Sequence, residues 1–142
     1  MNLIFICTGN TCRSPMAAAI FQKLAAEHGL PVNIRSAGMA AVEGEPASPN
    51  AVQACREIGI DLSAHRSRQL RRDDLSWADL FLVMSPSHAA VLTQAGIPTE
   101  KIRILDMPDP YGGSLEVYRA CRDALTSCLE RLAGELSEAD HG

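Results

Sequence analysis

The chain has 142 residues, of which 46% are apolar and 21% are charged, and it carries a formal net charge of −4 at pH 7. This composition is typical of a soluble globular protein, and the length suits one domain with a buried core. The acidic balance argues against non-specific nucleic-acid binding, because that activity needs a dense basic surface. We therefore expect no nucleic-acid partner.

Eleven of the 13 basic residues are arginine, and four of them cluster at Arg66, Arg68, Arg71 and Arg72. We interpret this cluster as a solvated helix face, with a patch for an anionic partner as the alternative. The apolar run at 3–6 is too short for a signal peptide or a membrane span. Five cysteines, an odd number, do not form a disulfide framework and indicate a reducing compartment. We expect a cytoplasmic monomer that does not bind membranes.

Strands and helices are expected to alternate along the chain. Apolar runs predict strands at 3–6, 32–36, 77–84 and 101–105, and helical spacing predicts helices at 16–27, 51–57, 86–95 and 115–136. Residues 137–142 are expected to form a flexible tail. The alternation predicts an α/β fold, a doubly wound parallel sheet of about four strands with helices on both faces. No linker divides the chain, so we expect a single domain over 1–142.

The segment "CTGNTCRSP", from Cys7 to Pro15, follows the first strand and leads into the first helix. Ligands of such folds bind where a strand turns into a helix. Gly9 and Asn10 tolerate left-handed backbone angles, so the amides from Thr8 onward can point into one anion-binding concavity. Ser14 is expected to be the N-cap and Pro15 the first residue of a helix, whose positive end points to the same place. The segment therefore predicts a cradle for a tetrahedral oxyanion.

Cys7 is expected at the floor of this cradle, where its thiolate would be a nucleophile aligned for in-line attack at phosphorus. Arg13 would hold the phosphate oxygens in a bidentate contact, and the hydroxyl of Ser14 would donate to the thiolate. The alternative for Cys7, a small buried apolar side chain, explains none of the loop. Cys12 is either a small packed side chain or a redox partner that protects Cys7 from over-oxidation.

The segment "DMPDPYGGS" supplies two candidates for the acid that protonates the leaving group, Asp106 and Asp109. Asp109 is favoured because Pro110 stiffens the loop and Tyr111 would wall the substrate pocket. The same residue would later activate water to hydrolyse the phosphocysteine. We expect no metal and no cofactor, since no His, Cys and Asp cluster has ligand spacing.

The chain resembles the low-molecular-weight protein tyrosine phosphatase family. Five motifs carry the resemblance in the family's order: "CTGNTCRSP", "RSAG" at 35–38, "GIDLSAHRSRQL" at 59–70, "ADLFLVM" at 78–84 and "DPYGGSLEVY" at 109–118. The resemblance implies that Cys7 is the nucleophile, Arg13 the phosphate clamp and Asp109 the general acid. It also implies that Asn10 holds the loop conformation, Ser14 activates the thiolate and Cys12 is the redox partner.

Thr11 together with "DPYGGS" is similar to the bacterial protein-arginine phosphatase branch, whereas tyrosine phosphatases of the family commonly carry an aliphatic residue at position 11. Tyr111 stands where that branch has phenylalanine. The resemblance implies hydrolysis of phosphoarginine on protein substrates, with inorganic phosphate as product and phosphotyrosine as the alternative. The Thr11 hydroxyl at the rim would favour a guanidinium over a phenyl ring, and Asp109 would pair with that guanidinium.

Two further classes share part of the pattern. A thioredoxin-linked arsenate reductase would use two relay cysteines, but Cys121 and Cys128 fall on the apolar stripe of the last helix. A non-catalytic phosphate-binding module would have no use for Cys7 and Asp109 together. His65 and His88 are interpreted as packed or surface side chains rather than catalytic ones.

Overall fold

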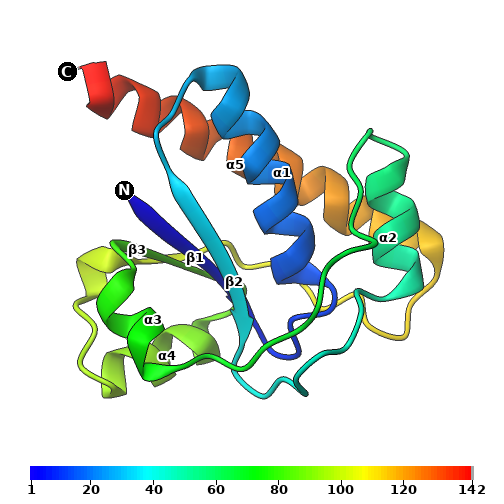
Figure 1. The fold of residues 1–142 in the computed structure, drawn as a ribbon, viewed down its shortest axis with the longest axis horizontal. Helices are drawn as coiled ribbons and strands as arrows, with labels where there is room; N and C mark the ends of the chain where they lie inside the picture. The colour runs from blue at the N-terminus through cyan, green and yellow to red at the C-terminus, as the bar shows by residue number, and fades with distance from the viewer. Residues whose placement is uncertain (142) are drawn as a thin grey trace.

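The computed structural model describes residues 1–141 and contains one four-stranded sheet covered by helices (Figure 1). Every strand pairing is parallel, in the order β2-β1-β3-β4. The strands are β1 (Asn2–Cys7), β2 (Asn33–Gly38), β3 (Leu80–Val83) and β4 (Ile102–Ile104). The helices are α1 (Arg13–His28), α2 (Pro49–Arg56), α3 (Arg72–Trp77), α4 (Pro86–Gln94) and α5 (Leu115–His141), with a 3-10 turn, η1 (Thr99–Lys101). The predicted α/β class is confirmed.

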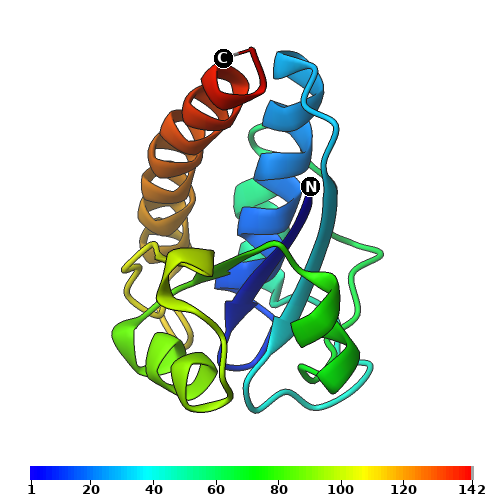
Figure 2. The ribbon, with the colours of Figure 1, turned by 90° about the vertical axis from the view of Figure 1, so that its left-hand side faces the viewer.

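Both faces of β1 are buried, and each is covered by a different set of helices. Leu3 and Phe5 pack with residues of α1, α2 and α5, whereas Ile4 and Ile6 pack with residues of α3 and α4. Figure 2 shows α1 and α5 rising together on one side of the sheet, with α3 and α4 on the other. Because side chains alternate along a strand, a continuous apolar run is what a doubly covered central strand requires.

Helix α1 ends as the sequence predicts, but α5 is longer than expected. Gly29 closes α1 in the left-handed conformation (φ 64°) and donates its N–H to the carbonyls of Ala25 and Ala26. The predicted tail from residue 137 is instead helical through His141, and position 142 lies outside the described residues. None of the helices in residues 1–141 is long and apolar enough to cross a membrane.

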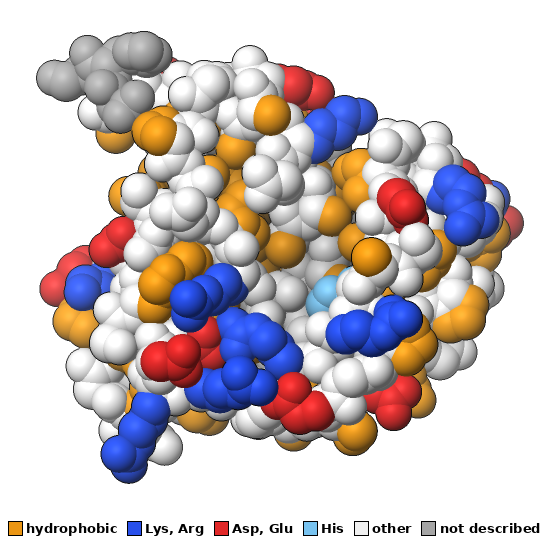
Figure 3. All heavy atoms as spheres, in the orientation of Figure 1, with side chains coloured by type: hydrophobic (Ala, Val, Ile, Leu, Met, Phe, Trp, Pro, Cys, Tyr) orange, Lys and Arg blue, Asp and Glu red, His pale blue; other side chains and the backbone are white. Residues whose placement is uncertain are grey.

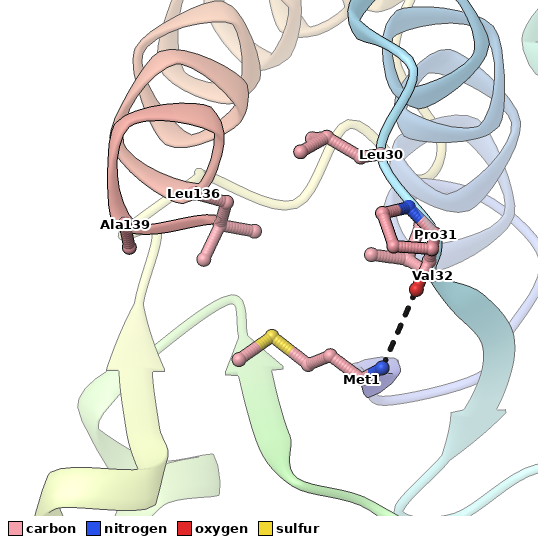
Figure 4. Close-up of a pocket in the computed structure, with 6 residues that line it drawn as sticks. All are labelled: Met1, Leu30, Pro31, Val32, Leu136 and Ala139. Atoms are coloured by element: carbon pink, nitrogen blue, oxygen red, sulfur yellow. Dashed lines mark hydrogen bonds between the residues drawn. The ribbon is translucent and has the colours of Figure 1, made fainter. Parts of the chain in front are cut away.

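An apolar cavity of about 230 Å³ lies between the end of α5 and the start of the chain. Leu136 and Ala139 of α5 face the start of β1 and the α1–β2 connection across this cavity (Figure 4). The remaining lining residues are Met1, Leu30, Pro31 and Val32. The N-terminal ammonium of Met1 donates to the carbonyl of Pro31 at 3.4 Å, which fixes the strand that bounds the cavity.

Helix α3 has no counterpart in the prediction, and β3 is shorter than the strand expected at 77–84. Six residues are too few to show helical periodicity. The helix is held at its start by Asp74, whose carboxylate accepts the backbone N–H of Arg71 at 2.9 Å. A carboxylate in the first helical turn also interacts favourably with the helix dipole.

Asp74 is also the centre of a charged cluster that reaches β2. Its carboxylate receives two hydrogen bonds from Arg68 (2.8 and 3.0 Å) and one from Arg35 (3.1 Å), and it is 1% exposed. Arg35 also lies 4.0 Å over the ring of Trp77. The expected solvated helix face is therefore wrong, because only Arg72 of the four clustered arginines lies in a helix. Arg68 precedes α3 and is half-buried and paired. Figure 3 shows basic side chains gathered over this region with acidic ones beside them.

We predict that Asp74→Asn lowers the free energy of unfolding at pH 7 by about 3 kcal/mol, because it leaves two guanidinium groups without their buried carboxylate. Burial alone would raise the pKa of Asp74, but the bonds from Arg68 and the Arg71 backbone outweigh it and lower the pKa. A carboxyl with a lowered pKa stabilises the fold above its ordinary value and loses that effect as the pH falls through the folded value. The difference between the two proteins should therefore shrink below about pH 4.

Urea unfolding at several pH values measures both effects. Asp73→Asn is the matched control, because Asp73 lies next in the same helix turn but is exposed. That variant should cost no more than about 1 kcal/mol. Equal stability of the two variants at pH 7 would contradict the role given to Asp74.

Candidate active site

The loop at residues 8–12, which joins β1 to α1 and is called here the β1–α1 loop, curls around the sulfur of Cys7. Cys7 ends β1 and is 3% exposed. Its Sγ accepts the backbone N–H of Asn10 at 3.3 Å and lies 2.9 Å from the Ser14 hydroxyl. Asn10 has φ 58°, in the left-handed region, as the sequence predicted for this turn. The expected cradle is therefore present, with Cys7 at its base.

Asn10 is fully buried, and its side-chain polar atoms and its carbonyl are all occupied behind the loop. Nδ2 donates to the hydroxyls of Ser14 (2.8 Å) and Ser36 (3.1 Å), and Oδ1 accepts the N–H of Arg68 (3.0 Å). The Asn10 carbonyl accepts from Nε2 of His65 at 2.7 Å, which places the ring proton on that nitrogen. Burial, ahead of other causes, lowers the pKa of His65, so the ring is neutral near pH 7.

The role of Ser14 follows from the same bonds. Since Asn10 donates to the Ser14 oxygen, the hydroxyl hydrogen is free to point at the Cys7 sulfur. The sequence expectation that Ser14 caps α1 is wrong. The helix begins at Arg13, Cys12 occupies the N-cap position, and no side chain accepts a capping hydrogen bond there. The Ser14 hydroxyl is used by the sulfur instead.

Gly38 at the end of β2 allows the loop to approach the sheet closely. A Cβ at this position would lie 2.6 Å from the Thr8 carbonyl oxygen and 3.1 Å from the Asn10 nitrogen. The carbonyls of Cys7 and Thr8 accept the N–H groups of Met39 and Ala40, both at 2.9 Å. The "RSAG" motif therefore packs directly against the β1–α1 loop, and only glycine fits its last position.

Arg13 connects the loop to the segment that precedes α5. Its guanidinium, with a side chain 7% exposed, donates to the Met107 carbonyl at 2.8 Å and lies 3.7 Å from the Asp109 carboxylate. Asp109 is half-exposed, and its other oxygen accepts the backbone N–H of Tyr111 at 3.0 Å. Asp106, the other candidate acid, is exposed and does not line the pocket beside Cys7.

Eight of the ten predicted site residues line one pocket of about 210 Å³ above the Cys7 sulfur. They are Cys7, Thr8, Gly9, Thr11, Cys12, Arg13, Asp109 and Tyr111. Asn10 and Ser14 lie behind the loop, and Tyr111 is 76% exposed at the rim. A sulfur nucleophile, donors for an oxyanion and a carboxylate thus face one space, which is what displacement at phosphorus with protonation of a leaving group requires.

Cys12 lines the pocket and is buried among hydroxyl groups. Its Sγ lies 3.3 Å from the Tyr118 hydroxyl and donates to Ser48 Oγ at 3.5 Å. Burial, followed by the bond to Cys12, raises the pKa of Tyr118 to about 12. The thiol is therefore well packed, as one of the two sequence interpretations expected. Within residues 1–141 all five cysteines are free.

Four contributors to the site were not predicted: Ser36, His65, Arg68 and the carbonyl of Met107. His65 and Arg68 lie in the "GIDLSAHRSRQL" motif, and Ser36 lies in "RSAG", so the motifs pointed to the right segments. Each contact spans at least 26 positions along the chain, and such pairs have no signal in spacing. Within residues 1–141 no group of three His, Cys, Asp or Glu side chains is placed to hold a metal ion.

Comparison with known proteins agrees with this geometry. Residues 2–141 match the family described as low molecular weight phosphotyrosine protein phosphatase. A protein-arginine-phosphatase from Bacillus subtilis is 41% identical over 97% of this chain and 98% of its own length. A low molecular weight protein-tyrosine-phosphatase from Streptomyces coelicolor is 39% identical over 89% of this chain and 83% of its own.

The fold has close counterparts among solved structures. The YwlE arginine phosphatase, in a C7S mutant with a phosphorylated active-site serine, superposes with a TM-score of 0.91 at 41% identity, covering 96% of this chain and 95% of that chain. The resemblance found in the sequence is thus confirmed over nearly the whole length. The chain belongs to the low molecular weight phosphotyrosine protein phosphatase family and is a protein phosphatase.

Proposed function

We propose that this phosphatase hydrolyses phosphoarginine on proteins through a phosphocysteine at Cys7, without a metal or cofactor. The observation that carries the proposal is the meeting of the Cys7 sulfur, the Arg13 guanidinium and the Asp109 carboxylate in one pocket. The solved structure of a 41% identical relative supports it, because in that protein's cysteine-to-serine mutant the active-site serine is phosphorylated.

The reaction has two displacements. In the first, the Cys7 thiolate attacks phosphorus, the S–P bond forms and the P–N bond to the substrate guanidino group breaks. Asp109, protonated, gives its proton to the departing nitrogen. In the second, the Asp109 carboxylate takes a proton from water, the oxygen attacks phosphorus, and inorganic phosphate leaves as the S–P bond breaks. Arg13 and the loop amides stabilise the phosphoryl oxygens in both steps.

The Ser14 hydroxyl stabilises the thiolate at both ends of the cycle. It lies 2.9 Å from Sγ, and its hydrogen points at the sulfur because Asn10 donates to its oxygen. A hydrogen bond to an ionised acceptor is stronger than one between neutral groups. The thiolate is therefore favoured before attack and again when it leaves phosphorus. Asn10 acts through the loop conformation and through Ser14.

The preference for phosphoarginine is supported by Thr11 and Asp109. Thr11 lines the pocket and offers a hydroxyl where a larger aliphatic side chain would contact a phenyl ring. Asp109 is half-exposed beside the pocket and can pair with a guanidinium. The relative named protein-arginine-phosphatase points the same way, but the tyrosine phosphatase at 39% identity makes phosphotyrosine the competing substrate.

A protein substrate is supported by a second groove beside the pocket. This groove has a volume of about 440 Å³ and shares Gly9, Thr11 and Tyr111 with the pocket. Residues 40–49 form its other wall. A phosphorylated side chain in the pocket would leave its flanking residues over this groove.

Burial raises the pKa of Cys121 to about 11, so this thiol is a poor relay nucleophile and arsenate reduction is disfavoured.

We further propose that residues 1–142 act as one domain, in a bacterial cytoplasmic monomer. The family match over residues 2–141 and the bacterial sources of the relatives support this.

Cys12 is proposed as the redox partner of Cys7. After a peroxide oxidises Cys7 to a sulfenic acid, the Cys12 thiol would displace water and form a reducible disulfide.

We predict that the wild type has a higher kcat/KM on a phosphoarginine peptide than on the phosphotyrosine peptide of the same sequence, and that Thr11→Ile reverses the preference. The larger aliphatic side chain removes the hydroxyl and adds contact for a ring. A shift of about tenfold or more in the ratio is expected. Thr11→Ser, which keeps the hydroxyl, is the matched control and should retain the preference. Wild-type preference for phosphotyrosine would overturn the substrate assignment and leave the Cys7 chemistry in place.

Asp109→Asn is expected to lower kcat by about 10² to 10⁴, because the amide can neither protonate the leaving group nor activate water. Asp106→Asn changes the other aspartate of the same segment and should keep kcat within about twofold. Steady-state kinetics with a Cys7→Ser negative control measures the effect. If Asp106→Asn is the inactive variant, the acid has been assigned to the wrong residue.

A further inference from the structure

His88 is a buried histidine that the two displacements do not use. It lies in the first turn of α4 and is 7% exposed. Its Nε2 is 3.1 Å from the hydroxyl of Thr8, which lines the pocket. Its Nδ1 is buried and has no hydrogen-bond partner among residues 1–141. Most buried polar atoms in folded proteins are hydrogen-bonded, so this nitrogen needs an explanation beyond packing.

Charged groups from two other elements act on the His88 ring. Burial lowers the pKa of His88, Arg13 of α1 lowers it further, and Asp109 of the segment before α5 raises it in part. On α4 itself, the backbone N–H of His88 donates to the Ser85 hydroxyl, and the positive end of the helix also opposes a cation. With Asp109 as the anion beside Arg13, the His88 ring is therefore neutral near pH 7.

An oxyanion in the pocket changes this balance. A dianion above Cys7 would lie against Arg13 and offset the positive charge that opposes protonation of His88. In the resulting imidazolium both ring nitrogens are donors. Nε2–H must then donate to the Thr8 oxygen, which leaves the Thr8 hydroxyl hydrogen free to donate into the pocket. Protonation of His88 and a donor bond to the dianion would thus favour each other.

We propose that His88 is a positioning residue that links oxyanion binding to proton uptake: Nε2 orients the Thr8 hydroxyl toward the pocket, and the neutral ring takes up a proton when a dianion binds. This inference requires only that the pocket binds an oxyanion. It does not depend on which phosphorylated residue the enzyme hydrolyses, so its failure and that of the proposed substrate are separable.

Sulfate is a suitable probe, because it remains a dianion from pH 5.5 to 8. Binding is measured calorimetrically in Cys7→Ser combined with Asp109→Asn, which removes the thiol and the carboxylate from the pocket. The sulfate Kd should fall by about fivefold or more between pH 8 and pH 5.5, the size of a typical coupling between two sites. Adding His88→Gln, which keeps a hydrogen-bonding group near Thr8 but cannot take up a proton, should reduce this change to less than about twofold.

Two controls isolate His88. His28→Gln in the same background changes an exposed histidine at the end of α1 and should keep the full pH dependence. Thr8→Val should weaken sulfate binding at pH 5.5, and Thr8→Ser, which keeps the hydroxyl, should restore it. A pH dependence that survives His88→Gln would overturn the proposal.

Ring signals of His88 in the nuclear magnetic resonance spectrum provide a test that does not rely on a His88 variant. In Cys7→Ser, saturating sulfate should move the His88 titration midpoint to higher pH. His65, which faces the Asn10 carbonyl, is followed separately in the same spectra. If sulfate leaves the His88 titration midpoint unchanged, the ring does not take part in anion binding and the inference is contradicted.

Discussion

Asn10 has a left-handed backbone conformation in the middle of the β1–α1 loop, at φ 58°. That conformation costs a non-glycine residue about 1 to 2 kcal/mol and persists only where surrounding contacts fix it. Here the contacts are four hydrogen bonds to Ser14, Ser36, Arg68 and His65. They lie behind the loop and leave its front face to the ligand. The direction of the loop amides, and the hydrogen of Ser14 that points at Cys7, both depend on this one residue.

The support for Asn10 extends to charges well away from the pocket. Arg68 gives its backbone N–H to Asn10, while its guanidinium is held by the buried carboxylate of Asp74. Asp74 in turn fixes the start of α3 and receives Arg35 from β2. A buried carboxylate is retained only where its partners compensate for lost hydration. Packing on the face of the sheet covered by α3 therefore holds the loop at the sheet's carboxyl edge.

The sequence predicts those parts of the site that are local in the chain. From Cys7 to Ser14 the residues are consecutive, so their order alone indicates a nucleophile, a turn and a helix start. The four-stranded parallel sheet follows equally well from apolar runs, because β1 buries Leu3 and Phe5 on one face and Ile4 and Ile6 on the other. The position of Asp109 at the pocket was also predicted, since a carboxylate in a proline-stiffened loop is recognisable without knowing its partner.

The features that the sequence did not predict depend on contacts between residues that are far apart in the chain. Ser14 has the residue type of a helix cap, and only the position of Cys7 and Asn10 decides that its hydroxyl serves the sulfur. Helix α3 is too short for periodicity and forms through Asp74 contacts to other segments. His88 is a packed side chain, as the sequence predicted, and the role proposed for it depends on Thr8, 80 positions away, which lies against its ring.

Arg13 explains how a pocket built mainly from one loop is joined by Asp109, the proposed acid, from a distant segment. Arg13 holds that segment through the Met107 carbonyl at 2.8 Å, whereas its contact with the Asp109 carboxylate is longer, at 3.7 Å, and half-exposed. A bound dianion would replace the carboxylate as the main partner of the guanidinium, because it carries more charge and accepts a bidentate contact. Substrate binding would thus release the Asp109 carboxylate from the guanidinium, while the shorter bond to Met107 keeps its segment in place.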